Sequence, residues 1–301
     1  MRLYLSSIIN VYGIMLAMSF LIPEEETVLS ELLPLLAEGS SRRTQLSWLK
    51  AQRVWVDGTA AKDLRMRVRA GQKVQLVPRR QEVGQGLQIL YQDAHIVVVD
   101  KPAGLLSVDN DKDLTPSAHR YLKRVVHPKR VYVAHRLDRD TSGVLVFALT
   151  VEALEKLKTQ FKSHSIEREY IAIVEGHPPQ KSGTWESYLH EDRRYFVHSE
   201  ETPGRGERAV THYKIEARSK KYSWLELRLE TGKKNQIRVH CADAGCPIAG
   251  DRKYGPSIKK AQRLCLHARH LGFIHPVTGK ALRFTSPIPK VFTEFFPKGR
   301  Q

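Results

Sequence analysis

Residues 222–229, Tyr-Ser-Trp-Leu-Glu-Leu-Arg-Leu, show the alternation that most clearly indicates a β-sheet fold for this chain. Every second side chain from Ser223 to Leu229 lies on one face, because an extended strand has a side-chain period of two. Further runs typical of strands are residues 96–99, 131–134, 144–148, 170–174, 210–217 and, after a Thr278-Gly279 hairpin turn, 281–285. This excess of strands predicts an α+β domain with a large mixed, mostly antiparallel sheet.

Two helices are expected beside these strands. Residues 151–161 carry apolar side chains at helical spacing, on one side of the helix. Residues 235–244 form the second helix, which ends before Gly245 because glycine tolerates the left-handed conformation at a helix end. The strands begin near Leu87, so the large domain is expected to cover residues 87–301.

A smaller domain is predicted ahead of it, over residues 24–80. It contains a leucine-rich segment at 28–36, a basic helix-like stretch at 41–51, a strand at 54–56, a turn at Asp57-Gly58 and a strand at 74–77. The polar, glycine-containing residues 81–86 are expected to be a linker between the two domains.

Residues 1–23 form an apolar extension with three interpretations. Residues 3–22 carry no charge, follow the single Arg2 and end before Pro23, as in a weak secretory signal. The segment can instead pack on the body as a short apolar helix, or it precedes the usual first residue, Met15 or Met18.

Composition points to a globular protein with a polyanionic partner. Hydrophobic residues make up 41% of the chain, which is enough for a core and excludes wholesale disorder. Lys and Arg number 49 against 32 Asp and Glu, a formal charge of +17, which favours nucleic acid over a membrane as the partner. Three cysteines are too few for a disulfide scaffold, so we expect a protein of the cytoplasm.

The densest polar stretch, residues 135–143, lies between two of the apolar strands. It reads His-Arg-Leu-Asp-Arg-Asp-Thr-Ser-Gly, and loops held between core strands are places where a scaffold presents reactive groups. Arg136 and Arg139 are expected to hold the Asp138 carboxylate ionised, as a nucleophile or base requires. From spacing alone, an ordinary charged turn is the alternative. The cysteine spacings do not fit a zinc site, so no metal is predicted.

Residues 135–143 resemble the signature of the RluA-type pseudouridine synthases, and further blocks follow in the order of that family. They are Lys101-Pro102-Ala103-Gly104, Arg168-Glu169-Tyr170, residues 231–240 (Thr-Gly-Lys-Lys-Asn-Gln-Ile-Arg-Val-His), residues 250–255 (Gly-Asp-Arg-Lys-Tyr-Gly) and residues 264–268 (Leu-Cys-Leu-His-Ala). The resemblance spans residues 87–290. Lys234-Asn235 departs from it, since the family often has a shorter side chain followed by His there.

The resemblance implies isomerisation of uridine to pseudouridine in RNA, without cofactor or metal. It implies that Asp138 is the essential carboxylate, which attacks the sugar or removes a sugar proton, and that Arg238 pairs with it and keeps it charged. Tyr170 would stack on the flipped uracil, and Arg136 would fill the place that the flipped nucleotide leaves. The other substrate contacts that it implies are His135, Gln236, Leu266 and Lys101.

The small domain resembles the RNA-binding domain of the ribosomal-protein-S-four type, a common attachment in this family. The resemblance rests on residues 41–43 (Ser-Arg-Arg), 53–58 (Arg-Val-Trp-Val-Asp-Gly) and 69–74 (Arg-Ala-Gly-Gln-Lys-Val). It implies RNA contacts by Ser41, Arg42, Arg43, Arg53, Lys62, Arg65 and Arg67. A merely solvated basic face is the alternative.

Two other function classes are considered for this chain. One is a non-catalytic RNA-binding or ribosome-assembly protein. The other is a hydrolase that uses Asp138, with His135 as the base. Ribosomal RNA of the large subunit is the preferred substrate, with transfer RNA as the alternative. We expect a monomer that works without a membrane.

Overall fold

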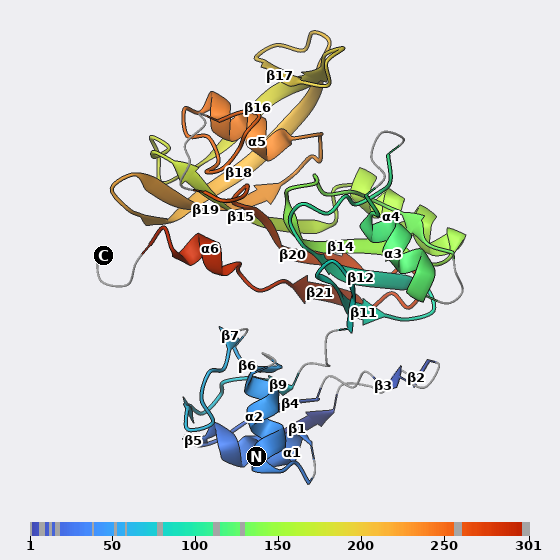
Figure 1. The fold of residues 1–301 in the computed structure, drawn as a ribbon, viewed down its shortest axis with the longest axis vertical. Coiled ribbons are helices and arrows are strands. Elements are labelled where there is room, and N and C mark those ends of the chain that lie inside the picture. Colours follow the sequence, from blue (N-terminus) through green and yellow to red (C-terminus); the bar gives the residue numbers. More distant parts are fainter. Residues whose placement is uncertain are drawn as a thin grey trace. The chain divides into compact units, whose positions relative to one another are not determined.

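The computed structural model describes residues 2–5, 10–11, 14–15, 19–37, 39–50, 53–57, 59–76, 81–110, 115–126, 130–255 and 261–296. It divides into two compact units, Met1–Arg80 and Gln81–Gln301, and each is described by itself (Figure 1). Of the positions named above, Met18, Ala51, Gly58, 77–80 and 297–301 lie outside the described residues.

Unit 1 is a small α+β unit. Its order is β1 (Arg2–Leu5), β2 (Asn10–Val11), β3 (Ile14–Met15), β4 (Ser19–Ile22), β5 (Thr27–Val28), α1 (Leu29–Leu36), α2 (Arg42–Lys50), β6 (Val54–Val56), β7 (Thr59–Ala60), β8 (Arg67–Val68) and β9 (Val74–Leu76). An antiparallel sheet of order β1-β4-β9-β6-β7 packs with α1 around the fully buried Leu21, Leu29, Leu33, Val54 and Val74.

The expectation of a separate apolar extension over residues 1–23 is wrong for its last residues. Ser19–Ile22 form a strand, not a helix, and pair with β9 in the register Ser19↔Leu76. Leu21 is fully buried in the core of unit 1. The apolar character of this segment therefore follows from its place in the sheet.

Unit 2 is built on one large mixed sheet. Its strands are β10 (Gln81–Gly84), β11 (Leu87–Gln92), β12 (Ile96–Lys101), β13 (Tyr132–Val133), β14 (Ser142–Ala148), β15 (Glu167–Glu175), β16 (Ser182–Glu191), β17 (Val197–Glu200), β18 (Glu207–Arg218), β19 (Tyr222–Leu229), β20 (Leu266–Ile274) and β21 (Ala281–Thr285). The main path is β10-β11-β12-β14-β20-β15-β19-β18-β16-β17, with β13 beside β14 and β21 beside β20. Only β14 and β20 run parallel among the described pairs, so the predicted mixed, mostly antiparallel sheet is confirmed.

The expected linker at residues 81–86 is wrong as well. Gln81–Gly84 form β10, which pairs with β11, and Gln85 and Gly86 make the turn between them with positive φ angles. The backbone of an edge strand pairs whatever the polarity of its side chains, which is why a polar sequence hid this strand. The boundary between the units lies at Arg80.

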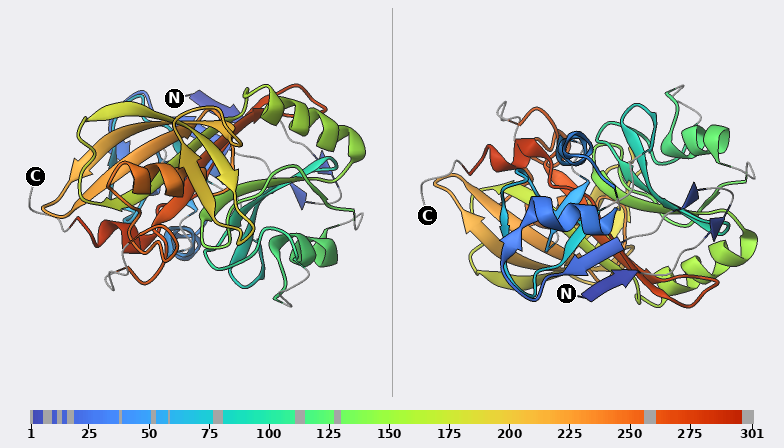
Figure 2. Two further views of the ribbon diagram at one scale, coloured as in Figure 1. Left: turned by 90° about the horizontal axis from the view of Figure 1, so that it is seen from above. Right: turned by 90° about the horizontal axis from the view of Figure 1, so that it is seen from below.

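The described residues of unit 2 form four helices beside the sheet: α3 (Ala118–Val125), α4 (Val151–Lys162), α5 (Gln236–Asp243) and α6 (Lys290–Thr293). Side chains alternate along β12 and β14, so that α3 packs with Val97 and Val99 while α4 packs with Ile96 and Val98. Helices α3 and α4 thus lie on opposite faces, and α5 packs against β16, β17 and β18 at the other end of the sheet (Figures 1 and 2).

Candidate active site

The loop that carries Asp138 enters the sheet at its centre, where β14 meets β20. Two residue pairs, Ser142↔His267 and Gly143↔Ala268, join these parallel strands. Gly143 has a φ of 118°, and a Cβ atom there would lie 2.1 Å from the carbonyl oxygen of Ala268. Only glycine allows this approach, which brings the loop ahead of β14 over the start of β20.

The backbone is fixed on both sides of Asp138. Ser107 Oγ donates to the Leu137 carbonyl at 2.7 Å and accepts from the Leu137 N–H at 3.1 Å. Lys101, fully buried at the end of β12, donates from Nζ to the carbonyls of Arg139, Leu105 and Pro102 at 2.9, 2.7 and 3.1 Å. Burial lowers the pKa of Lys101 to about 7. The lysine therefore holds the loop in place.

The Asp138 carboxylate is a partly buried charge at the edge of this anchored loop. Its side chain is 26% exposed, and Oδ2 lies 3.7 Å from Nη1 of Arg238. Burial raises its pKa, while the positive charges of Arg238, Arg136 and Lys101 oppose that rise. The expectation that Arg136 and Arg139 hold Asp138 ionised needs correction: the largest opposing charge comes from α5, and Arg139 Nε donates to the Gly104 carbonyl at 3.2 Å.

Arg238 is held mainly by a carboxylate that the sequence did not single out. Its Nε and Nη2 donate to Oδ2 and Oδ1 of Asp251, both at 2.7 Å, and the Asp251 side chain is 0% exposed. Nη1 donates to Oδ1 of Asn235 at 3.2 Å, and the guanidinium lies 5.2 Å from the centre of the Tyr254 ring. The predicted pairing of Arg238 with Asp138 is present as an ion pair, and the two-point contact is to Asp251.

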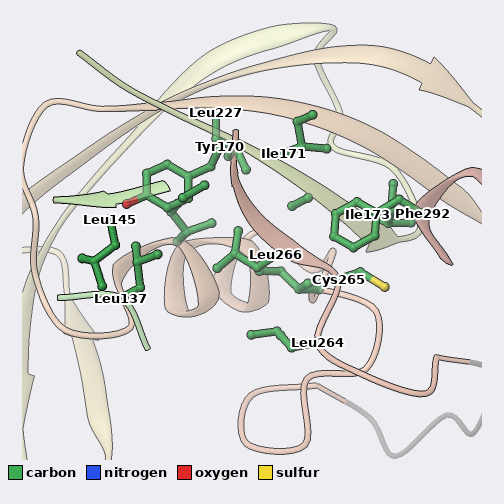
Figure 3. Close-up of a cluster of buried hydrophobic side chains, with 14 of the residues drawn as sticks. Leu137, Leu145, Tyr170, Ile171, Ile173, Leu227, Leu264, Cys265, Leu266 and Phe292 are labelled. Atoms are coloured by element: carbon green, nitrogen blue, oxygen red, sulfur yellow. The ribbon is translucent and has the colours of Figure 1, made fainter. Parts of the chain in front are cut away.

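Tyr170 is buried beside the Asp138 loop. It lies on β15, is 9% exposed and belongs to one apolar cluster with Leu137, Leu145, Leu227 and Leu266 (Figure 3). Burial raises the pKa of Tyr170 to about 12, with a further rise from the Asp138 charge and an opposing effect of Arg168. Asp138, Arg238, Tyr170 and Leu266 thus converge from a loop, a helix and two neighbouring strands.

The comparisons with known proteins identify this arrangement. Residues 95–243 match the family model described as RNA pseudouridylate synthase. The chain is 39% identical over 226 residues to the ribosomal large subunit pseudouridine synthase D of Zymomonas mobilis, covering 68% of this chain and 70% of that protein. It is 34% identical over 293 residues to the protein of that name from Xanthomonas campestris, covering 88% and 85%. The chain belongs to the RNA pseudouridylate synthase family.

Solved structures agree with this membership at the level of the fold. Human RNA Pseudouridylate Synthase Domain Containing 4 is 25% identical with a TM-score of 0.56, covering 68% of this chain and 90% of that one. Human RNA Pseudouridylate Synthase Domain Containing 1 is 24% identical with a TM-score of 0.57, covering 69% and 85%. The expected α+β class and the expected isomerase, an RNA pseudouridine synthase, are therefore confirmed.

Three residues for which the resemblance implies substrate contacts make hydrogen bonds within the synthase, and their contacts with substrate stay a prediction. His135 Nε2 accepts from the Val146 N–H at 3.2 Å, its ring packs 4.5 Å from that of Phe161, and burial lowers its pKa to about 3. Gln236 is 2% exposed. Its amide bonds to Thr231, Lys233, Val210 and Thr211. Together with Lys101, these side chains hold the surrounding backbone in place. His135 packs on the α4 side of the sheet.

Arg136 and Leu266 are the other two residues of unit 2 for which the resemblance implies contacts with RNA, and these contacts stay a prediction. Arg136 is exposed on the Asp138 loop, while Leu266 is 3% exposed beside Tyr170. Arg168, for which the sequence motifs implied no role, donates to the Glu230 carbonyl at 2.9 Å and lies so close to Gly232 that a Cβ there would be 2.4 Å from Nη1. It supports the segment that leads into α5.

The residues of unit 1 that are expected to bind RNA differ in their exposure and in their contacts within the protein. Ser41 Oγ accepts from the Thr44 N–H at 3.2 Å, at the start of α2. Arg42, Arg43 and Lys62 are exposed. Arg53 lies over Trp48 at 5.6 Å, and Arg65 and Arg67 form ion pairs with Asp63 at 3.5 Å and Glu26 at 2.8 Å. The family match lies in unit 2, so the S-four-type identity of unit 1 stays a prediction.

Among the described residues, no three His, Cys, Asp or Glu side chains are grouped to hold a metal ion. No helix in the part of the chain that the structure describes is long and apolar enough to cross a membrane.

Proposed function

We propose that this synthase converts a uridine of large-subunit ribosomal RNA to pseudouridine, with Asp138 as the catalytic residue. The observation that carries the proposal is the carboxylate of Asp138, anchored on both sides and set 3.7 Å from Arg238 in the family-matched part of the chain. Its relatives in Zymomonas mobilis and Xanthomonas campestris are named as ribosomal large subunit enzymes, which supports this RNA over transfer RNA.

The reaction is an isomerisation in which atoms balance within one nucleotide. The bond from N1 of uracil to C1′ of ribose breaks, the base turns, and C5 bonds to C1′. C5 then loses its proton, and N1 gains one. Asp138 serves either as the nucleophile on the sugar or as the base that removes a sugar proton, because an ionised carboxylate fits both roles.

The neighbours of Asp138 have separate tasks in this proposal. Arg238 favours the ionised carboxylate, which burial alone would drive toward protonation. Tyr170 offers a ring for the uracil to stack on, and its raised pKa keeps the hydroxyl protonated at neutral pH. Arg136, exposed on the same loop, occupies the place of the flipped nucleotide in the RNA stem.

Unit 1 is proposed to add affinity for RNA through its exposed cations. Arg42 and Arg43 begin α2 and Lys62 is exposed as well, while the formal charge of the whole chain is +17. We place the synthase in the cytoplasm as a monomer. The three cysteines are buried and free, as suits a reducing compartment.

The test compares Asp138→Asn with Asp140→Asn on an unmodified transcript of large-subunit ribosomal RNA. Asp140 is an exposed carboxylate on the same loop, so its variant controls for the loss of a charge. Wild type and Asp140→Asn should form pseudouridine, whereas Asp138→Asn should bind the transcript and form none. Turnover of Asp138→Asn within tenfold of wild type would refute its catalytic role.

The same assay separates the rival functions. An assembly protein would bind the transcript without forming pseudouridine, and a hydrolase would release free uracil. Pseudouridine formed in a transfer RNA pool but not in the ribosomal transcript would move the substrate to transfer RNA.

A further inference from the structure

The Arg238 guanidinium is immobilised by groups other than the reactive carboxylate. Nε and Nη2 make the two-point contact with Asp251 at 2.7 Å each, and Nη1 donates to Asn235 at 3.2 Å. Asn235 is fixed in turn, because it adopts the left-handed conformation at φ 55° and its Nδ2 donates to the Tyr254 hydroxyl at 3.1 Å. The plane and position of the guanidinium are therefore set before any RNA arrives.

Asp251 cannot follow Arg238 if the arginine moves. Its side chain is 0% exposed, and Oδ1 also accepts the backbone N–H groups of Lys253 at 2.9 Å and Tyr254 at 3.1 Å. A buried carboxylate held by its own turn is a rigid anchor for the arginine. Asp251 bonds to Arg238, and Arg238 in turn lies 3.7 Å from Asp138, so the position of Asp251 reaches the reactive carboxylate through the arginine.

The distance between Arg238 and Asp138 shows the effect of this anchor. The closest approach, 3.7 Å from Nη1 to Oδ2, is longer than a hydrogen bond between nitrogen and oxygen. Arg238 thus gives Asp138 a favourable charge without occupying a lone pair of its carboxylate. A free arginine would close this gap, because direct hydrogen bonds between guanidinium and carboxylate are short and strong.

We propose that Asp251 is a positioning residue for the isomerisation, which holds Arg238 at ion-pair distance from Asp138 and so leaves the reactive carboxylate oxygen free for the sugar. The inference rests on the proposed function of Asp138. The proposal gives the segment after α5 a role in the reaction itself, which is distinct from stacking on the uracil and from binding RNA.

The pH profile reports on this role. The charged and titratable groups that face Asp138 are Arg136 on its own loop, Lys101 at the end of β12, Arg238 on α5, Asp251 after α5 and Tyr170 on β15. The negative charge of Asp251 raises the pKa of Asp138, and the three cations lower it. Removing that charge and letting Arg238 approach both lower the pKa of Asp138, so the acid limb of the pH profile should move to lower pH.

The experiment measures kcat, KM and the acid limb for Asp251→Asn on the large-subunit ribosomal RNA transcript. The matched control is Asp93→Asn in the turn between β11 and β12. Asp93 is also a buried carboxylate, 8% exposed, and accepts from the Tyr91 hydroxyl, the backbone N–H groups of His95 and Ile96, and the His275 ring. Both variants lose one buried charge, but only one of them touches Arg238.

Asp251→Asn should lower kcat at least tenfold, leave KM for RNA within twofold and move the acid limb to lower pH. Asp93→Asn should lower thermal stability and keep the wild-type kcat and acid limb. Wild-type kcat with an unmoved acid limb in Asp251→Asn would overturn the proposal. An inactive wild-type enzyme on both ribosomal and transfer RNA would instead refute the proposed function, so the two failures are distinguishable.

A second variant covers the case in which Asp251→Asn does not fold. Asn235→Gly keeps the left-handed backbone, which glycine adopts without strain, and removes the amide that accepts from Nη1 and donates to the Tyr254 hydroxyl. It should lower kcat by a smaller factor at unchanged KM. If Asn235→Gly turns over like wild type while Asp251→Asn is unfolded, Arg238 needs no such positioning and the proposal fails.

Discussion

The buried contact between Arg238 and Asp251 should be much more strongly coupled than an exposed ion pair of the same geometry. We expect this from burial, because the Arg238 side chain is 11% exposed and that of Asp251 is 0% exposed. The exposed pair of Arg208 and Glu186 has the same two-point form, at 2.7 and 3.1 Å, but its side chains are 48% and 46% exposed. The two ion pairs have the same geometry and differ in burial, so a comparison of their coupling energies measures the effect of burial.

The loss of folding free energy in Arg238→Met can be calculated from the hydrogen bonds that this substitution removes. Arg238→Met takes two charge-assisted hydrogen bonds away from Asp251, at about 1.5 to 3 kcal/mol each, and leaves its carboxylate with two backbone donors. Breaking one side of a buried pair costs about 3 to 5 kcal/mol, which agrees with that sum. In the double variant with Asp251→Asn, the uncompensated charge is gone, so we expect a coupling energy of about 2 to 3 kcal/mol.

The assay is a double-mutant cycle on the free energy of unfolding. Since the chain has two compact units, a single global transition is not assured. Hydrogen exchange along a urea series, read on peptides from β18 and β19, confines the measurement to unit 2. The cycle of Arg208→Met and Glu186→Gln serves as the control and should give a much smaller coupling, because water screens an exposed pair. Equal coupling in the two cycles would refute the argument from burial.

Three further predictions concern the ring, the buried lysine and unit 1. Tyr170→Phe should keep the KM for RNA, because the ring still stacks, and lower turnover at least tenfold; equal turnover would show that the hydroxyl has no chemical task. Lys101 has a folded pKa of about 7, below its ordinary 10.5. The unfolded chain therefore binds more protons between these values, and the stability of wild type relative to Lys101→Met should rise as pH rises through that window; urea denaturation from pH 6 to 10 that gives a constant difference would contradict it. Arg42→Ala combined with Arg43→Ala should flatten the dependence of log affinity on log salt by roughly 0.7 to 0.9 for each phosphate group that the protein no longer neutralises, and an unchanged slope in salt titrations would mean that α2 does not touch RNA.

The fold could be predicted from sequence wherever side chains follow a simple period. The continuous apolar runs of β12 and β14 reflect complete burial, whereas the alternation in β18 and β19 and the helical spacing in α4 reflect one-sided burial. The predicted ends of these elements lie within a few residues of the observed ones. Other elements have no such signal. The polar β10 pairs through its backbone, and α3 buries only Ala118 and Leu122.

The sequence predicts which residues lie at the site, but it does not predict the hydrogen-bond partners of those residues. Asp138, Tyr170 and Arg238 lie together as the motif blocks implied. Lys101 and Gln236 stand in the same blocks and were therefore expected to touch substrate, but burial commits their polar atoms to backbone and side chains of the scaffold. A motif records that a residue type matters at a position, whereas its burial depends on strands far away in the sequence.

Lys101, Ser107 and Asp251 share one feature, which is that they restrict the movement of Asp138 and Arg238. Lys101 and Ser107 hold the carbonyls of Arg139 and Leu137, so the loop cannot shift on either side of the carboxylate. Asp251 holds the guanidinium in the same way from α5. The Arg238 charge acts on Asp138 at a fixed distance, so the groups that hold both residues must be fixed as well. If those groups had to reorganise during the reaction, part of the transition-state stabilisation would be lost. The buried lysine weakens the fold through its desolvation, because burial lowers its pKa. For Asp251, the hydrogen bonds from Arg238 and from its own turn outweigh desolvation and lower the pKa of the carboxylate, so the anchor of the arginine also stabilises the fold.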